Sequence, residues 1–345
     1  MNKIKENLTG IYNSKYDTDI LAGLLKTPFE ESGEILTFAD KVKEEFCGHG
    51  ILLRGIVEFS SYCKNNCYYC GLNNGNKKIE RYRLNEKEIL SAVKKIADNN
   101  IKTAVLQSGE DESFDWDLIT FIVKKIKKDL AMSVTLSCGE LESAVYEKWR
   151  KAGADRYLLK IETSNKKLYE TLHPGMSFEN RLNCLDTLKE LGYQAGSGVI
   201  IGLKGQTLED IANDIMFFAK KDFDMIGINP FIAHSESMLK KHPVGDPFLT
   251  IKAVALTRIV TKNAHLPATT ALGSVGKEDL RITALKSGAN VIMPNFTPYQ
   301  YRKQYEIYPD KRCLSEDENI MEYLEEMAEK SGKVLDFSTG DTLKK

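Results

Sequence analysis

The chain has 345 residues, and 42% of them are hydrophobic, which is enough to bury one large core. Lys and Arg (48) nearly balance Asp and Glu (49), so the net charge of −1 argues against general binding to nucleic acid or to anionic membranes. The N-terminal segment has no apolar run, and nowhere do about 18 apolar residues follow one another. We therefore expect no signal peptide, no membrane span and a cytoplasmic location.

The predicted secondary structure changes near residue 50. Before it, apolar residues recur with a helical period, for example from Ile35 to Phe46, so residues 1–50 are expected to form a helical extension. After it, β-rich runs alternate with helical stretches. Strands are predicted near 51–58, 103–107, 132–137, 155–160, 195–201, 223–228, 267–271 and 289–293. Helices are predicted near 86–99, 115–129, 140–152, 177–192, 207–221, 248–263 and 278–287, the first with a capping box of Asn85 and Glu88.

Eight predicted strands separated by helices indicate parallel βα units, and such units close naturally into a (β/α)8 barrel of the α/β class. The alternative is an open, doubly wound sheet. The barrel is expected to span residues 51–313. Residues 314–345 are polar and are expected to form a peripheral helix and a frayed tail.

Three of the seven cysteines lie close together directly after the first predicted strand. Cys63, Cys67 and Cys70 have the spacing C-x3-C-x2-C, which in a chain without a secretory signal is more typical of a metal site than of disulfides. Thiolates are the standard ligands of iron–sulfur clusters, and three of them satisfy three corners of a cubane while the fourth iron stays open. A structural zinc site, the alternative, would need a fourth ligand, and His49 is expected at the opposite end of the barrel.

With the aromatic Tyr69 before its last cysteine, this loop resembles that of the radical S-adenosylmethionine (SAM) superfamily. The resemblance implies a [4Fe-4S] cluster and SAM as cofactors. In that superfamily the open iron binds the methionine moiety of SAM, and one electron from the cluster yields methionine and a 5′-deoxyadenosyl radical. The resemblance also implies an external one-electron donor such as ferredoxin or flavodoxin.

Further segments resemble the SAM-binding motifs of the superfamily. Residues 108–111 follow the second predicted strand and resemble a GGE-type motif, which receives the amino group of the methionine moiety. Glu162 and Arg181 resemble ribose- and carboxylate-binding positions, and Ile200 lies in a segment similar to the adenine-contact motif. Without the resemblance these features would be read as a turn, a surface helix charge and ordinary strand packing. The implied cofactor-binding residues are Tyr69, Ser108, Gly109, Glu110, Asp111, Glu162, Arg181 and Ile200.

Longer stretches, among them RGIVEFSSYCKNNCYYCGL, VLQSGED, DFDMIGI and GANVIMPNFTP, resemble the HydE family of [FeFe]-hydrogenase maturases, whose relatives are biotin synthase and methylornithine synthase. The likeness implies hydrogenase maturation, a cysteine-bound iron carbonyl/cyanide complex as substrate, and other maturases as partners. It also implies a substrate cavity inside the barrel, although ordinary packing is an equal alternative for each residue taken alone. The implied lining residues are Arg54, Glu58, Thr135, Lys160, Thr269, Thr270 and Met293, with Tyr301 and Tyr305 as a cap.

Two positions depart from the family pattern. HydE proteins often carry three further C-terminal cysteines for a second cluster, whereas Cys313 has no cysteine near it, so one cluster is expected. Several HydE proteins have Arg where Lys160 stands, and Lys keeps the charge but loses the planar bidentate fork. Two other functions stay open: a radical SAM carbon-skeleton mutase similar to methylornithine synthase, and a non-catalytic iron–sulfur scaffold.

Overall fold

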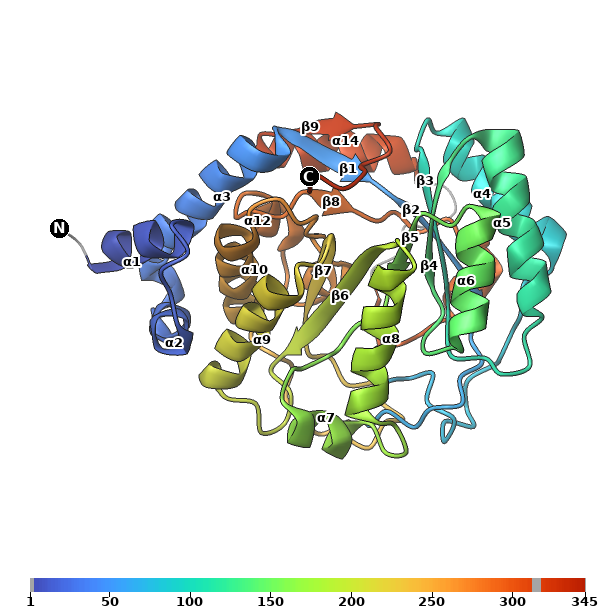
Figure 1. The fold of residues 1–345 in the computed structure, drawn as a ribbon, viewed down its shortest axis with the longest axis horizontal. Coiled ribbons are helices and arrows are strands. Elements are labelled where there is room, and N and C mark those ends of the chain that lie inside the picture. Colours follow the sequence, from blue (N-terminus) through green and yellow to red (C-terminus); the bar gives the residue numbers. More distant parts are fainter. Residues whose placement is uncertain (1–2, 312–317, 345) are drawn as a thin grey trace.

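The structure is a computed structural model that describes residues 3–311 and 318–344. Cys313 lies outside the described residues. The N-terminal segment is helical, as predicted, and packs on the outer surface of the molecule (Figure 1). Its elements are α1 Lys3–Tyr12, α2 Thr18–Lys26, the 3-10 helix Phe29–Glu31 and α3 Gly33–Cys47. Apolar side chains on one face of α1, α2 and α3 are buried, and α2 packs on α9 (Leu208–Lys221) while α3 packs on α10 (Pro247–Thr261).

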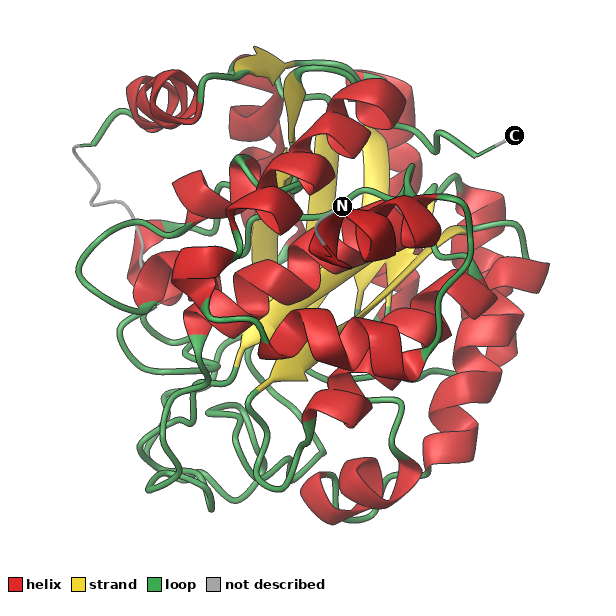
Figure 2. Ribbon diagram, turned by 90° about the vertical axis from the view of Figure 1, so that its left-hand side faces the viewer, coloured by secondary structure: helices red, strands yellow, loops and turns green. Residues whose placement is uncertain are grey.

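A parallel sheet with the strand order β2-β3-β4-β5-β6-β7 forms most of the barrel wall, with β8 and β9 paired on either side of β1. Helices surround these strands, as Figure 2 shows. The strands are β1 Gly50–Leu53, β2 Gly55–Ser60, β3 Thr103–Ser108, β4 Ser133–Ser137, β5 Arg156–Leu158, β6 Gln194–Ile201, β7 Met225–Pro230, β8 Val291–Ile292 and β9 Val334–Asp336. Between β7 and β2 the wall is linked by isolated parallel bridges. They join Met225 of β7 to His265, Pro267 to Val291 of β8, and Asn295, just after β8, to Ile56 of β2. The predicted α/β barrel architecture is thus confirmed.

The helices that follow the strands agree well with the predicted ranges. The capping box at α4 is present, because Asn85 Oδ1 accepts from the Glu88 N–H at 3.1 Å while Glu88 Oε2 accepts from the Asn85 N–H at 2.8 Å. The short helices α7, α11 and α13 were not expected from the sequence pattern. The remaining helices are α4 Glu86–Asp98, α5 Trp116–Leu130, α6 Ser143–Ala152, α7 Lys166–Leu172, α8 Phe178–Glu190, α11 Thr270–Ser274, α12 Arg281–Leu285, α13 Tyr299–Arg302 and α14 Ile320–Ser331.

The structure corrects two predicted strands. The run 51–58 is divided at Arg54, because β1 pairs with β8 and β9 whereas β2 pairs with β3. Residues 267–271 form no strand. Pro267 makes a single bridge and lacks the N–H that a continuous ladder would need, and α11 begins three residues later at Thr270.

The C-terminal segment also differs from expectation. Helix α14 is present, but the residues after it do not fray. They form β9, which pairs with β1, and then run beneath the strand starts, where Arg156 and other buried side chains bind them. A polar segment whose partners lie far away in the sequence gives no local signal of such order. Among the described residues, no helix is long and apolar enough to cross a bilayer.

Candidate active site

The cysteine loop begins directly after β2 and is held by backbone hydrogen bonds to distant segments. The Lys64 N–H donates to Glu110 O at 2.9 Å, and the Tyr68 N–H donates to Leu172 O at 3.0 Å. Arg81 braces the loop from inside, because its guanidinium donates to the carbonyls of Ser61, Leu72 and Asn73. Sequence reasoning missed Arg81, since nothing local marks a residue eleven positions after Cys70 as part of the loop.

The three predicted cluster ligands share this loop. Cys67 and Cys70 line a cavity at the C-terminal end of the strands, and the volume of this cavity, including its open mouth, is about 1030 Å³. Burial raises the pKa of all three thiols, that of Cys70 to about 12. Metal binding to them would therefore release protons. Within the described residues, no three Cys, His, Asp or Glu side chains converge on a point where one ion could sit. The ligands of a cubane bind separate irons and need not meet at one point.

Glu110 presents a buried carboxylate oxygen next to the cysteine loop. Its Oε1 accepts from the Glu140 N–H at 3.0 Å and lies 3.7 Å from Arg181 Nη2, while its Oε2 is buried and accepts no hydrogen bond from the described residues. Burial raises the pKa of Glu110, and Arg181 opposes the shift. Gly139 must be glycine, because a Cβ there would lie 1.9 Å from Glu110 Cγ. The free oxygen is suited to an ammonium donor.

Arg181 is not a surface helix charge, since only 7% of it is exposed, and it lines the cavity beside the cysteine loop. Its Nε donates to Glu140 Oε1, and its Nη1 donates to Lys160 O at 2.6 Å. Glu140, which the sequence analysis did not single out, therefore connects Arg181 with the Glu110 loop. Glu162 lines the same cavity, has a φ of +64° and forms an ion pair with Lys160 Nζ at 2.8 Å. Left-handed backbone at a residue other than glycine is typical of a constrained functional position.

Tyr69 is fixed in the cavity wall by a buried histidine. Burial lowers the pKa of His173 to about 4, so its ring is neutral. His173 Nδ1 lies 2.7 Å from Tyr169 O, which can only accept, so Nδ1 carries the proton. His173 Nε2 then accepts from the Tyr69 hydroxyl at 2.7 Å. Ser108 and Ile200 line the same cavity, as predicted for cofactor-binding residues.

Two of the four residues 108–111 have structural roles that the motif did not reveal. Gly109 lies against the cysteine loop, because a Cβ there would be 2.3 Å from Tyr62 O and 2.8 Å from Cys63 Cβ. Asp111 does not face the cavity. It accepts from Arg83 at 2.6 and 2.7 Å and from Ser60 Oγ at 2.6 Å, so it braces the end of β2. Its expected contact with the cofactor is therefore not supported.

A second, deeper cavity lies inside the barrel and adjoins the first. The two share several lining residues, which are Gln107, Leu158, Lys160, Asn229, Ala271, Ile307 and Tyr308. All seven predicted barrel-interior residues line the deeper cavity, namely Arg54, Glu58, Thr135, Lys160, Thr269, Thr270 and Met293. The strand alternation left their direction open, and the structure shows that they point inward.

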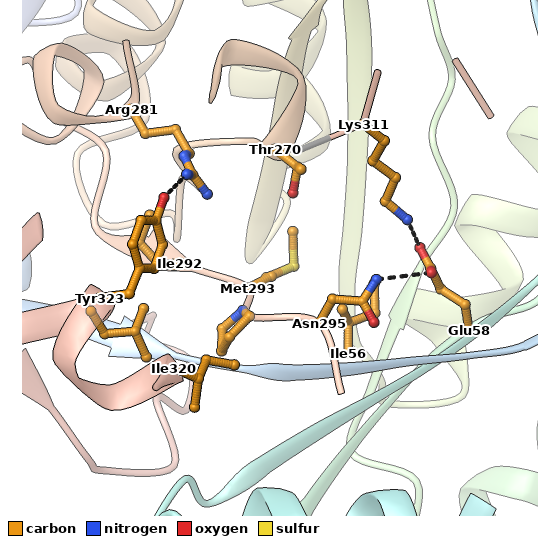
Figure 3. A pocket seen from close by; sticks show the side chains of 12 residues that line it. Ile56, Glu58, Thr270, Arg281, Ile292, Met293, Asn295, Lys311, Ile320 and Tyr323 are labelled. Atoms are coloured by element: carbon orange, nitrogen blue, oxygen red, sulfur yellow. Dashed lines mark hydrogen bonds and ion pairs between the residues drawn. The ribbon is translucent and has the colours of Figure 1, made fainter. Parts of the chain in front are cut away.

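Glu58 is neutralised by a residue that the sequence analysis missed. Its Oε1 pairs with Lys311 Nζ, and its Oε2 accepts from Asn295 Nδ2 at 2.9 Å (Figure 3). Because Glu58 is only 2% exposed, its carboxyl oxygens need such partners in place of water. Glu58 and Lys311 line both the deeper cavity and a side pocket whose wall also includes Met293 and Thr270.

The two tyrosines predicted as a cap have different positions. Tyr305 lines the first cavity, beside the cysteine loop, and its hydroxyl lies 3.2 Å from Gln107 Nε2. Tyr301 does not line either cavity. It stacks on Tyr82 with 4.7 Å between ring centroids and donates to Glu88 Oε1 at 2.9 Å, so it belongs to the packing between α13 and α4. The expected substrate role of Tyr301 is therefore not supported.

A parallel barrel with three cysteines on the loop after its first wall strand, beside a deep cavity, has the architecture of a radical SAM enzyme. The family model described as the radical SAM superfamily matches residues 57–218. The [FeFe] hydrogenase maturase subunit HydE of Thermotoga maritima is 47% identical over 304 residues, which are 87% of this chain and 87% of that protein. The chain therefore belongs to the HydE family within the radical SAM superfamily.

Two other relatives are more distant. A 3-methylornithine synthase of Methanosarcina acetivorans is 30% identical over 277 residues, which cover 79% of this chain and 78% of that protein. The crystal structure of methylornithine synthase (PylB) has a TM-score of 0.81 at 23% identity and covers 96% of this chain and 97% of that one, which shows a shared fold. Members of the superfamily use a [4Fe-4S] cluster and SAM, and the residues here fit both: three thiols on one loop and the unpartnered Oε2 of Glu110 beside them.

Proposed function

We propose that this protein is a hydrogenase maturase that cleaves SAM reductively and directs the resulting 5′-deoxyadenosyl radical at a cysteine-bound iron carbonyl/cyanide complex during assembly of the [FeFe]-hydrogenase active site. The observation that carries the proposal is the 47% identity with a HydE over 87% of both chains. The two adjoining cavities, one at the cysteine loop and one inside the barrel, support it, because substrate and SAM must meet away from water.

In this proposal the cysteine loop and its surroundings hold the cofactors. Cys63, Cys67 and Cys70 bind the cluster, which when bound supplies the electron that cleaves SAM. Glu110 Oε2 accepts from the ammonium group of SAM, and Arg181 holds the Glu110–Glu140 pair in place. The wall residues Tyr69, Ser108, Glu162 and Ile200 contact the rest of SAM.

The deeper cavity holds the substrate in this proposal. Its threonines, Thr135, Thr269 and Thr270, offer hydroxyl groups, and Lys160 and Arg54 offer positive charge. Polar groups of this kind inside a barrel are costly unless they have partners, and Thr135 Oγ1 and Thr269 Oγ1 are buried without one in the described part of the chain. A polar substrate could use these two hydroxyls. Ferredoxin or flavodoxin would serve as the electron donor, and other maturases would be partners.

Anaerobic turnover tests the proposal. The reconstituted protein is reduced with dithionite and given SAM with or without the iron cysteinate complex, and 5′-deoxyadenosine and the iron product are quantified. We expect 5′-deoxyadenosine in both cases and conversion of the iron complex only with SAM. Absence of SAM cleavage would support the scaffold alternative. The 30% identity with 3-methylornithine synthase favours one rival, so formation of 3-methylornithine without conversion of the iron complex would assign the chain to that activity instead.

A further inference from the structure

The far end of the barrel from the cysteine loop is covered by the last described residues. Residues 339–344, called here the C-terminal strap, bind the starts of several strands. Thr103, the first residue of β3, donates its hydroxyl to Thr339 O at 2.9 Å, and the Thr342 N–H donates to Gln194 Oε1, on the first residue of β6, at 3.1 Å. Thr342 also donates to Asp224, just before β7. The strap therefore crosses the N-terminal ends of the wall strands.

Two buried arginines bind the strap from the barrel side. Arg54 lines the deeper cavity, is 4% exposed and donates from Nη2 to Gly340 O at 3.1 Å. Arg156 is fully buried and uses Nη2 for Thr339 O at 3.0 Å, Gly340 O at 3.1 Å and Asp341 Oδ1 at 2.5 Å. Buried cations need such partners, because an unpaired charge in the interior is strongly destabilising. Outside the strap, Arg156 donates to Gln194 Oε1 at 2.9 Å and Arg54 donates to Met225 Sδ at 2.7 Å, so the strap supplies the acceptors for the Nη2 group of each arginine.

The path of the strap depends on Gly340. This residue is buried, has a φ of +59°, and a Cβ there would lie 2.9 Å from both Cδ atoms of Leu52. Its carbonyl is the atom that Arg54 and Arg156 share. His265 Nε2, on another cavity-lining residue, reaches Asp341 O at 2.9 Å. The strap therefore contacts the cavity floor through Arg54 and His265.

We propose that the C-terminal strap closes the floor of the substrate cavity and that Gly340 is a positioning residue for Arg54, which faces the substrate. This inference rests on the proposed function, since it assigns the deeper cavity to the substrate. Arg54 Nη1 donates to Met225 Sδ at 2.7 Å, whereas its Nε has no partner among the described residues, so the strap fixes the guanidinium and leaves the Nε–H available. The C-terminal strap, whose composition alone indicates disorder, then forms part of the substrate site.

The experiment compares full-length reconstituted variants with the wild type. Gly340→Ala and Asp341→Asn disturb the strap, and Ser338→Ala, exposed and just before the strap, is the matched control. Hydrogen–deuterium exchange should accelerate in peptides 50–58 and 103–108 of the strap variants and stay unchanged in the cysteine-loop peptide 61–75. The KM for the iron complex should rise about tenfold or more, the effect of one lost charge-assisted hydrogen bond, while the KM for SAM stays within about twofold.

Each outcome decides the inference. Unchanged exchange at the strand starts would show that the strap does not close the floor. Faster exchange with an unchanged KM for the iron complex would show that it does not position Arg54. A double variant with Arg54→Lys should lose little more than either single variant, because both changes act through one contact, and full additivity would contradict the positioning role. If wild-type protein does not convert the iron complex, the proposed function fails, whereas the exchange data still test the floor.

Discussion

Replacing Glu110 with Gln should weaken SAM binding strongly while leaving the cluster in place. The amide oxygen would keep the hydrogen bond from the Glu140 N–H, so the new NH2 group would occupy the position of the unpartnered Oε2 and face the ammonium group of SAM. A charge-assisted hydrogen bond contributes about 1.5–3 kcal/mol. Because Glu110 is 7% exposed, solvent screens little of this interaction. The dissociation constant of SAM should therefore rise by about ten- to a hundredfold.

Anaerobic equilibrium dialysis on reconstituted protein measures this dissociation constant, and the absorption spectrum reports on the cluster. Glu112→Gln is the matched control, since Glu112 is 70% exposed and pairs with Lys64 at 3.2 Å, so its loss should change SAM affinity by at most about fivefold. If Glu110→Gln bound SAM as tightly as the wild type with an intact cluster, the assignment of Oε2 to the ammonium group would be wrong.

Three further changes test other parts of the reasoning. A variant with Cys63, Cys67 and Cys70 all changed to Ala should lose nearly all of its roughly four irons per chain, whereas Cys184→Ala should keep them; iron retained in the triple variant would place the ligands elsewhere. Cys313→Ser should leave iron content and SAM cleavage intact, and loss of about half the iron would reveal a second cluster site. Asp214 is fully buried, and burial raises its pKa to about 7. The folded state then binds this proton more tightly than the unfolded state, so the stability it contributes is present below about pH 4 and is lost as the pH rises through about 7. Asp214→Asn should remove that loss, so its free energy of unfolding relative to wild type should increase by roughly 2–3 kcal/mol between about pH 5 and about pH 7, and a constant difference across this range would refute the shift.

Features that depend on neighbours along the chain can be predicted from the order of residues alone. The spacing of Cys63, Cys67 and Cys70 follows directly from the order of residues, and the position of Glu110 after a strand puts it at the same end of a parallel barrel. Periodicity gave the helices and most strands because each element buries its own apolar face. The capping box at Asn85 was likewise readable, since both of its hydrogen bonds span three residues.

Which polar groups have partners depends on segments that come together only in the folded protein. Glu110 and Asp111 are adjacent carboxylates, yet Glu110 Oε2 is buried without a hydrogen-bond partner in the described part of the chain, whereas Asp111 accepts two hydrogen bonds from Arg83. The same holds for Tyr301, which packs on Tyr82, and for Lys311, which neutralises Glu58. In each case the partner lies far away in the sequence, so no local pattern records the contact.

The C-terminal strap shows the same dependence on distant contacts. Its residues are polar and carry no periodicity, which by composition alone indicates a frayed end. Its order comes from acceptors that two buried arginines require, and Arg54 and Arg156 are separated from Gly340 by 286 and 184 positions. Local sequence can specify the element to which a residue belongs, but the satisfaction of a buried charge is settled only when distant segments meet.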